Sequence, residues 1–160
     1  MTTRTTEAPV GERLRILGSA RTVALVGVSA NPLRSSNFVA TYLIRTSYTI
    51  WPVNPTYSEV LGLRCYPALA DLPEPPDIVD VFRRAEEIPS VVEEAIDVGA
   101  KVVWFQLGLR HEEAAERARE AGLAVVQDRC LKIEHARFAG GLHLGGFDTG
   151  VITSKRRRPI

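Results

Sequence analysis

Short runs of consecutive apolar residues alternate along the chain with segments in which apolar residues recur at helical spacing. Five runs have the nearly uninterrupted apolar character that is typical of parallel strands buried on both faces. These runs cover residues 22–28, 48–53, 77–82, 101–107 and 123–127. Because parallel strands need a crossover between them, we expect the intervening helical segments to cover the resulting sheet.

Four segments between or before these strands have the apolar spacing of amphipathic helices. They cover residues 10–18, 36–46, 86–98 and 111–121. In the second, Phe38, Tyr42 and Leu43 mark one helical face, and Ser35 or Ser36 is placed to cap its start. The alternation predicts an α/β fold, a Rossmann-like three-layer sandwich. Its mostly parallel five-stranded sheet should have the order 3-2-1-4-5, with helices on both faces.

In sheets of this kind a ligand binds beyond the carboxyl ends of the strands, where the strand order reverses. The predicted order places this crevice where the first and fourth strands diverge. Five stretches should meet there, namely residues 27–36, 53–55, 83–84, 106–109 and 128–130.

Length and composition favour a single domain without a strong overall charge. A chain of 160 residues with 45% hydrophobic residues can bury a sizeable core. We expect a flexible arm over residues 1–9, the domain over 10–139 and a Gly-rich basic tail over 140–160. The formal net charge of +1 gives no general attraction to nucleic acid or to an anionic membrane.

The apolar runs and the cysteines bear on the compartment. No run approaches the roughly 20 apolar residues of a membrane span. Only two cysteines occur, Cys65 and Cys130. They could pair in principle, but in a reducing compartment small core thiols are more common. We therefore expect a cytoplasmic protein that does not contact membranes.

The loop over residues 27–36 reads GVSANPLRSS and has features of a phosphate-binding loop. Gly27 permits a tight turn and close approach of a phosphate, while the amides that open the next helix favour negative charge. Arg34 adds a cation. The loop is neither G-x-G-x-x-G nor GxxxxGK[ST], which argues against a standard dinucleotide fingerprint and against a nucleoside triphosphatase. A serine-rich turn that only caps the helix is the alternative.

The ends of the second and third strands indicate which phosphate ligand fits. The second strand ends in Asn54 and Pro55, without the acidic residue that grips the ribose of NAD. The third is followed by Arg83 and Arg84, whose guanidinium groups suit a phosphate monoester. CoA with its 3′-phosphate and NADP with its 2′-phosphate both qualify, and a solvated helix start is the alternative for the two arginines.

Several motifs in order resemble the small CoA-binding proteins with a Rossmann-like fold, which are similar to the CoA-binding domain of the succinyl-CoA synthetase alpha subunit. They are VALVGVSANPLRSS, WPVNP with EVLG and CYPALADLP after it, DIVDVFRR, VVWFQLGL and VVQDRCLKIEH, and they span roughly residues 21–135. The resemblance implies coenzyme A as the ligand.

The resemblance also implies site residues. It assigns the pyrophosphate to the first loop, at Gly27, Ser29, Ala30, Asn31, Arg34, Ser35 and Ser36, and we expect Val28 of the same loop to belong to the site. It places the adenosine beside Val53, Asn54, Pro55, Phe82 and Arg83, and we expect Arg84, which follows Arg83, to belong to the same site. A basic residue often follows the proline in this family, but Thr56 and Tyr57 stand there, which leaves the partner of the 3′-phosphate open.

The sequence contains no set of residues that forms a complete catalytic or metal site. Cys130 follows Arg129 and could exchange with another thiol, but a structural cysteine is the preferred interpretation. Glu134 and His135 are expected to be structural, and His111 to face solvent at a helix start. We expect a CoA-binding or acyl-CoA-binding protein without catalysis of its own. An NADP-dependent oxidoreductase and a CoA-binding interaction subunit of a larger enzyme are the alternatives.

The carboxyl-terminal tail is basic over Lys155, Arg156, Arg157 and Arg158. A charge run this short on a neutral domain is usually solvated, so we do not expect nucleic-acid binding. The tail could also fold onto a second copy of the chain, so a homo-oligomer is an open possibility.

Overall fold

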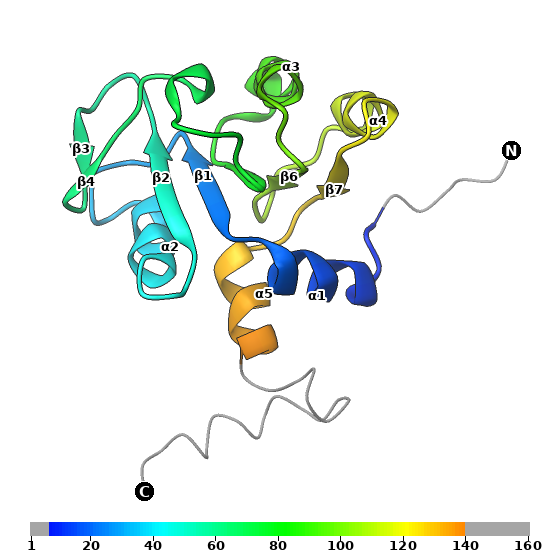
Figure 1. The fold of residues 1–160 in the computed structure, drawn as a ribbon, viewed down its shortest axis with the longest axis horizontal. Coiled ribbons are helices and arrows are strands. Elements are labelled where there is room, and N and C mark those ends of the chain that lie inside the picture. Colours follow the sequence, from blue (N-terminus) through cyan, green and yellow to red (C-terminus); the bar gives the residue numbers. More distant parts are fainter. Residues whose placement is uncertain (1–6, 140–160) are drawn as a thin grey trace, which may run out of the picture.

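Five parallel strands form one sheet in the computed structural model, which describes residues 7–139. The strands are β1 (Thr22–Val26), β2 (Thr49–Val53), β5 (Ile78–Val81), β6 (Val102–Phe105) and β7 (Ala124–Val126). Each lies within a predicted apolar run, because consecutive burial on both faces requires consecutive apolar residues. The Rossmann-like α/β fold class is confirmed (Figure 1).

Helices cover both faces of this sheet (Figure 1). One face carries α1 (Val10–Ser19), α2 (Ser35–Leu43) and α5 (Leu131–Arg137), and the other carries α3 (Ile88–Val98) and α4 (Glu112–Glu120). Alternate residues of β1 enter the two cores, with Val23 and Leu25 in one and Ala24 and Val26 in the other. The predicted three layers are therefore present.

The predicted strand order 3-2-1-4-5 is wrong. The observed order is β2-β1-β5-β6-β7, which is 2-1-3-4-5 when these strands are numbered along the chain. The strand β2 is an edge strand of this sheet and contains Pro52, which has no amide to donate. The Pro52 carbonyl accepts a hydrogen bond from the Tyr66 amide (2.9 Å), so Pro52 faces away from β1 and costs no bond to it. Proline is tolerated at a sheet edge, so Pro52 is the residue in the sequence that indicates an edge position for β2.

The connection from β2 to β5 contains no α-helix. It carries the antiparallel pair β3 (Glu59–Val60) and β4 (Leu63–Arg64) and the 3-10 turn η1 (Leu69–Asp71). A second 3-10 turn, η2 (Ala85–Glu87), leads into α3. Tyr66 also forms a bridge with Val53, so this connection covers the outer edge of β2 near the end of the strand.

Two expectations for the start and face of α2 are wrong. Arg34 occupies the N-cap position, and neither serine caps the helix through its side chain. Ser36 is instead used within the preceding loop, as described below. Phe38 is 63% exposed, whereas Leu43 is buried and Tyr42 is partly buried as predicted, so the buried face includes Val39 in place of Phe38.

Two buried polar groups stand out in the core below α1 and α5. Arg13 of α1 pairs with Glu134 of α5 at 2.9 Å, which gives Glu134 the structural role expected of it. Asp80 of β5 is fully buried, in register between Leu25 and Trp104. Neither Asp80 oxygen has a hydrogen-bond partner among the described residues, and burial raises the pKa of this carboxyl well above its usual value.

The predictions for the arm and the basic tail fall largely on residues 1–6 and 140–160, which lie outside the described residues. Of the described end, Ala8 is buried, and Glu7 pairs with Arg110 at 2.8 Å and with Arg129 at 3.0 Å. Both cysteines are free thiols. Within residues 7–139, no helix combines the length and apolarity that a membrane crossing requires.

Candidate functional site

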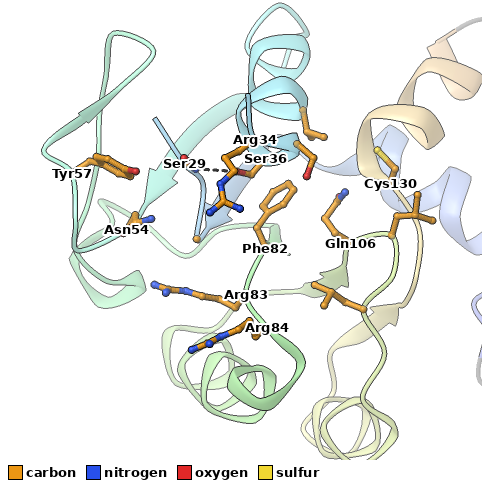
Figure 2. A pocket seen from close by; sticks show the side chains of 15 residues that line it. Ser29, Arg34, Ser36, Asn54, Tyr57, Phe82, Arg83, Arg84, Gln106 and Cys130 are labelled. Atoms are coloured by element: carbon orange, nitrogen blue, oxygen red, sulfur yellow. Dashed lines mark hydrogen bonds between the residues drawn. The ribbon is translucent and has the colours of Figure 1, made fainter. Parts of the chain in front are cut away.

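A cleft of about 650 Å³ opens beyond the carboxyl ends of the strands (Figure 2). Every strand of the five-stranded sheet contributes the segment that follows it, from Gly27 after β1 to Cys130 after β7. The predicted crevice is therefore present, but its position is corrected. The order reverses between β1 and β5, not between the first and fourth strands, so the loops after β1 and β5 form the centre of the cleft.

Most of the predicted binding residues line this cleft. They are Gly27, Ser29, Arg34, Ser35, Ser36, Asn54, Phe82, Arg83 and Arg84. Five predicted residues do not line it, namely Val28, Ala30, Asn31, Val53 and Pro55. Val28 and Val53 are buried in the two cores instead, and Asn31 braces the loop by accepting a hydrogen bond from the Leu33 amide at 2.9 Å.

Further residues line the cleft that were not predicted to bind a ligand. Gln106, Leu107, Leu109 and Cys130 come from two stretches that were expected at the crevice. Val39 lies one helical turn after Ser36, so helical spacing could have identified it. The segment that carries Tyr57 has no periodic pattern, and the one signal for Tyr57 was its place just after Pro55, where the family often has a basic residue.

Gly27 is required by the close approach of β1 and β5 at the floor of the cleft. Its φ is +91°, a conformation that favours glycine. A Cβ atom at this position would lie 2.6 Å from the Phe82 carbonyl oxygen and 3.2 Å from Cδ of Arg83. The loops after β1 and β5 can therefore meet here only without a side chain.

The loop between β1 and α2 is held by its own side chains. Ser36 Oγ accepts a hydrogen bond from the Ser29 amide at 2.9 Å, and Ser29 Oγ accepts one from the Asn31 amide at 3.0 Å. Asn37 Nδ2 donates to the Ser29 carbonyl at 2.9 Å. The Ser29 and Asn31 amides are thus engaged within the loop. At the start of α2, no group of the described residues accepts a hydrogen bond from the Ser35 or Ser36 amide.

The cleft is electropositive, because three arginines and no carboxylate line it. Arg84 pairs with Glu87 at 3.1 Å and is further from Glu86, at 3.8 Å. Arg83 lies 3.5 Å from Glu87 and is less exposed. Arg34 has no ion-pair partner in the described part of the chain, so its guanidinium is available to a ligand.

Asn54 and Tyr57 form one end of the cleft (Figure 2). Asn54 Nδ2 donates to the Val28 carbonyl at 2.9 Å, which ties the end of β2 to that of β1. A hydrogen bond with the Ser29 side chain, another with the Ala30 backbone and the nearby Arg34 lower the pKa of Tyr57. This end therefore presents a phenol and an amide beside cationic side chains.

Gln106 and Cys130 lie at the other end (Figure 2). Gln106 Oε1 accepts a hydrogen bond from the Leu131 amide at 3.0 Å, and only 6% of the residue is exposed. Arg129, which precedes Cys130, pairs with Glu7 at 3.0 Å and lies 3.8 Å from Glu134. The charge of Arg129 is thus shared with two carboxylates.

The other candidates for chemistry have structural contacts. His111 caps α4, with its Nδ1 accepting a hydrogen bond from the Ala114 amide at 3.1 Å, where solvent exposure was expected. His135 Nδ1 lies 2.9 Å from the Tyr42 hydroxyl, and burial lowers the pKa of His135. Among residues 7–139 no cluster of three or more His, Cys, Asp or Glu side chains could hold a metal ion.

Comparisons with known proteins agree with this fold. The protein YneT of Bacillus subtilis is 42% identical over 121 residues, which cover 76% of this chain and 90% of that protein. A solved structure from Pyrococcus horikoshii is 41% identical, covers 87% of this chain and 98% of its own, and has a TM-score of 0.81.

In a larger relative, only a small part of the protein is similar to this chain. The ADP-forming acetate–CoA ligase I of Archaeoglobus fulgidus is 29% identical over 129 residues, which cover 74% of this chain but only 19% of the ligase. The CoA binding domain family matches residues 21–136, a stretch that contains all five strands of the sheet and every residue lining the cleft. The chain belongs to the CoA-binding domain family.

Proposed function

We propose that this chain binds CoA or an acyl-CoA in the cleft, with the pyrophosphate at the start of α2. The Ser35 and Ser36 amides are available there, and the helix dipole favours an anion at this position. Arg34 stands at the N-cap with a guanidinium that has no described ion-pair partner. A diphosphate at this point would receive both backbone hydrogen bonds and a charge-assisted one.

The adenosine is proposed to occupy the end formed by Asn54 and Tyr57, with Phe82 beside it. Figure 2 shows the side chains of Arg83 and Arg84 directed toward this end. A 3′-phosphate on the ribose would find a cation there without the basic residue that is missing after Pro55. Arg83 is the preferred partner, because its contact with Glu87 is longer than that of Arg84.

One observation carries the proposal. In a chain that belongs to the CoA-binding domain family, the Arg34 guanidinium and the Ser35 and Ser36 amides lie at the same cleft, at the reversal point of the sheet, and none of them has a hydrogen-bond or ion-pair partner among residues 7–139. The acetate–CoA ligases, which share this domain, act on CoA, and this supports the same ligand for the present chain.

The test is calorimetric titration of Arg34→Ala with CoA, beside Arg45→Ala as control. Arg45 is exposed and follows α2 at the end away from the cleft, so both variants lose the same charge. Loss of one charge-assisted contact should weaken CoA binding about tenfold in Arg34→Ala, with no change in Arg45→Ala. Melting temperatures should match, because neither side chain supports the core. Equal affinities in the two variants would remove Arg34 from the site.

A further inference from the structure

The two ends of the cleft differ in chemistry. All three lining arginines come from the segments after β1 and β5, and Figure 2 shows Arg83 and Arg84 directed toward the end with Asn54 and Tyr57. The opposite end, formed by the segments after β6 and β7, has no charged lining residue and presents Leu107, Leu109 and Cys130. Leu107 is 65% exposed, so this end offers apolar surface that a ligand could cover.

Gln106 supplies a polar group within this apolar end. Only 6% of Gln106 is exposed, and its Oε1 accepts a hydrogen bond from the Leu131 amide at 3.0 Å. Because that partner is a donor, it fixes the amide orientation and leaves Nε2 as the free end. No group among residues 7–139 accepts a hydrogen bond from Nε2, and Figure 2 shows the side chain directed into the cleft.

Gln106 is only 6% exposed, and its Nε2 reaches the cleft without a partner among residues 7–139, so this donor can form a hydrogen bond with an acceptor of a bound ligand. No cation lines this end of the cleft in the described part of the chain, and Lys132, two residues after Cys130, lies over the rings of Phe38 and Tyr42 instead. Arg110 and Arg129 lie on the adjacent loops, but Glu7 engages both, and neither lines the cleft. The acceptor that suits this end is therefore an uncharged carbonyl with an aliphatic group attached.

We propose that this end of the cleft binds the acyl thioester of a CoA ligand, with Gln106 Nε2 donating to the thioester carbonyl and Leu107 and Leu109 covering a short uncharged acyl group. This inference rests on the proposed function, because it places the adenosine at the opposite end. It selects uncharged aliphatic acyl-CoA over free CoA and over CoA esters of dicarboxylic acids.

The test compares affinities for CoA, acetyl-CoA, butyryl-CoA and succinyl-CoA by calorimetry. Wild type should bind butyryl-CoA about fivefold to tenfold tighter than CoA, from one added hydrogen bond and partial burial of the alkyl chain. Acetyl-CoA should lie between them. Succinyl-CoA should bind no tighter than CoA, because its carboxylate would meet apolar side chains.

Gln106→Glu separates the ligand contact from the structural one. The carboxylate can still accept the Leu131 hydrogen bond, but it cannot donate to the thioester carbonyl. The ratio of butyryl-CoA to CoA affinity should fall to about one. Arg83→Ala is the control at the opposite end, and it should weaken all four ligands alike without changing the ratio.

The outcomes separate this inference from the proposed function. Binding of CoA with no preference for the uncharged acyl esters, or tightest binding of succinyl-CoA, overturns the acyl site and leaves CoA binding intact. An unchanged ratio in Gln106→Glu overturns the role of Gln106. Failure of CoA and all three esters to bind overturns the proposed function and this inference with it.

Discussion

The backbone at Gly27 lies so close to Phe82 that a Cβ atom on Gly27 would be 2.6 Å from the Phe82 carbonyl oxygen. This contact joins the ends of β1 and β5, the two neighbouring strands between which the sheet order reverses. The cleft floor therefore depends on a missing side chain as well as on the side chains that line it.

Gly27→Ala should disturb this floor more than a comparable glycine substitution elsewhere. Gly122→Ala is the matched control, because its φ of +94° is close to the +91° of Gly27, yet no atom lies within 4 Å of its added Cβ. The control should lose about 1 kcal/mol of unfolding free energy from the left-handed backbone alone. Gly27→Ala should lose clearly more and also weaken CoA binding. Denaturant unfolding measures the first loss and CoA titration the second. Equal losses of unfolding free energy in Gly27→Ala and Gly122→Ala would contradict the role of the contact with Phe82.

Ser36→Ala should loosen the loop that precedes α2. Removal of the hydroxyl leaves the part-buried Ser29 amide without its acceptor, at a cost of about 1 kcal/mol in unfolding free energy. CoA affinity should fall as well, because the loop sets the position of Arg34. Ser35→Ala serves as the stability control, since no hydrogen bond of its exposed side chain occurs among the described contacts. A Ser36→Ala variant as stable as Ser35→Ala would show that this hydrogen bond contributes nothing.

Arg83 and Arg84 should differ in their effect on the 3′-phosphate. We expect Arg83→Ala to reduce the preference for CoA over dephospho-CoA by about tenfold, by loss of one charge-assisted contact. Arg84 is more exposed and already pairs with Glu87 at 3.1 Å, so Arg84→Ala should change the preference less. Calorimetric titration of both variants with CoA and dephospho-CoA measures this preference. The reverse ranking would move the 3′-phosphate to Arg84.

Asp80 should make the protein less stable as pH rises. The folded-state pKa of this carboxyl is raised by burial, so the folded state keeps a proton that the unfolded chain releases above about pH 4. The stability lost is about 1.4 kcal/mol per pH unit between the unfolded and folded pKa values. Asp80→Asn removes this titration, so the unfolding free energy of Asp80→Asn relative to that of wild type should rise with pH above the unfolded-state pKa, as measured by urea unfolding.

Asp77 is the control with the opposite sign. Although burial raises its pKa, hydrogen bonds from the Arg21 and Thr22 amides and the nearby Lys101 lower it overall. Its contribution is present above the unfolded pKa and is lost as pH falls through the folded one. Asp77→Asn should therefore be less stable than wild type at pH 7, with a difference that shrinks toward low pH. If the difference in unfolding free energy between wild type and Asp80→Asn did not change from pH 5 to pH 8, the raised pKa of Asp80 would be contradicted.

The strands and the turn from β1 into α2 could be predicted because local sequence determines them. Consecutive apolar residues identify the buried strands, and Gly27 with the serines and Arg34 identifies the turn into α2. The strand order could not be read from pattern alone, because it depends on where the chain after β2 crosses the sheet. Pro52 was the one residue that marked β2 as an edge strand.

The site was predicted best where it follows the strand ends and least well where the chain is irregular. Arg34 and Arg83 follow directly from their strand positions, whereas Tyr57 reaches the cleft from a segment without a periodic pattern. The free donor of Gln106 depends on a contact with Leu131, which is 25 residues away along the chain. Long-range pairing of this kind leaves no trace in a single sequence.

The central claim is that the cleft holds the pyrophosphate and the phosphorylated adenosine of CoA. The most direct measurement is calorimetric titration of one preparation with CoA, dephospho-CoA and NADP. The account predicts CoA binding at one site per chain, weaker binding of dephospho-CoA and no comparable binding of NADP. Binding of NADP alone, or of none of the three, would contradict it.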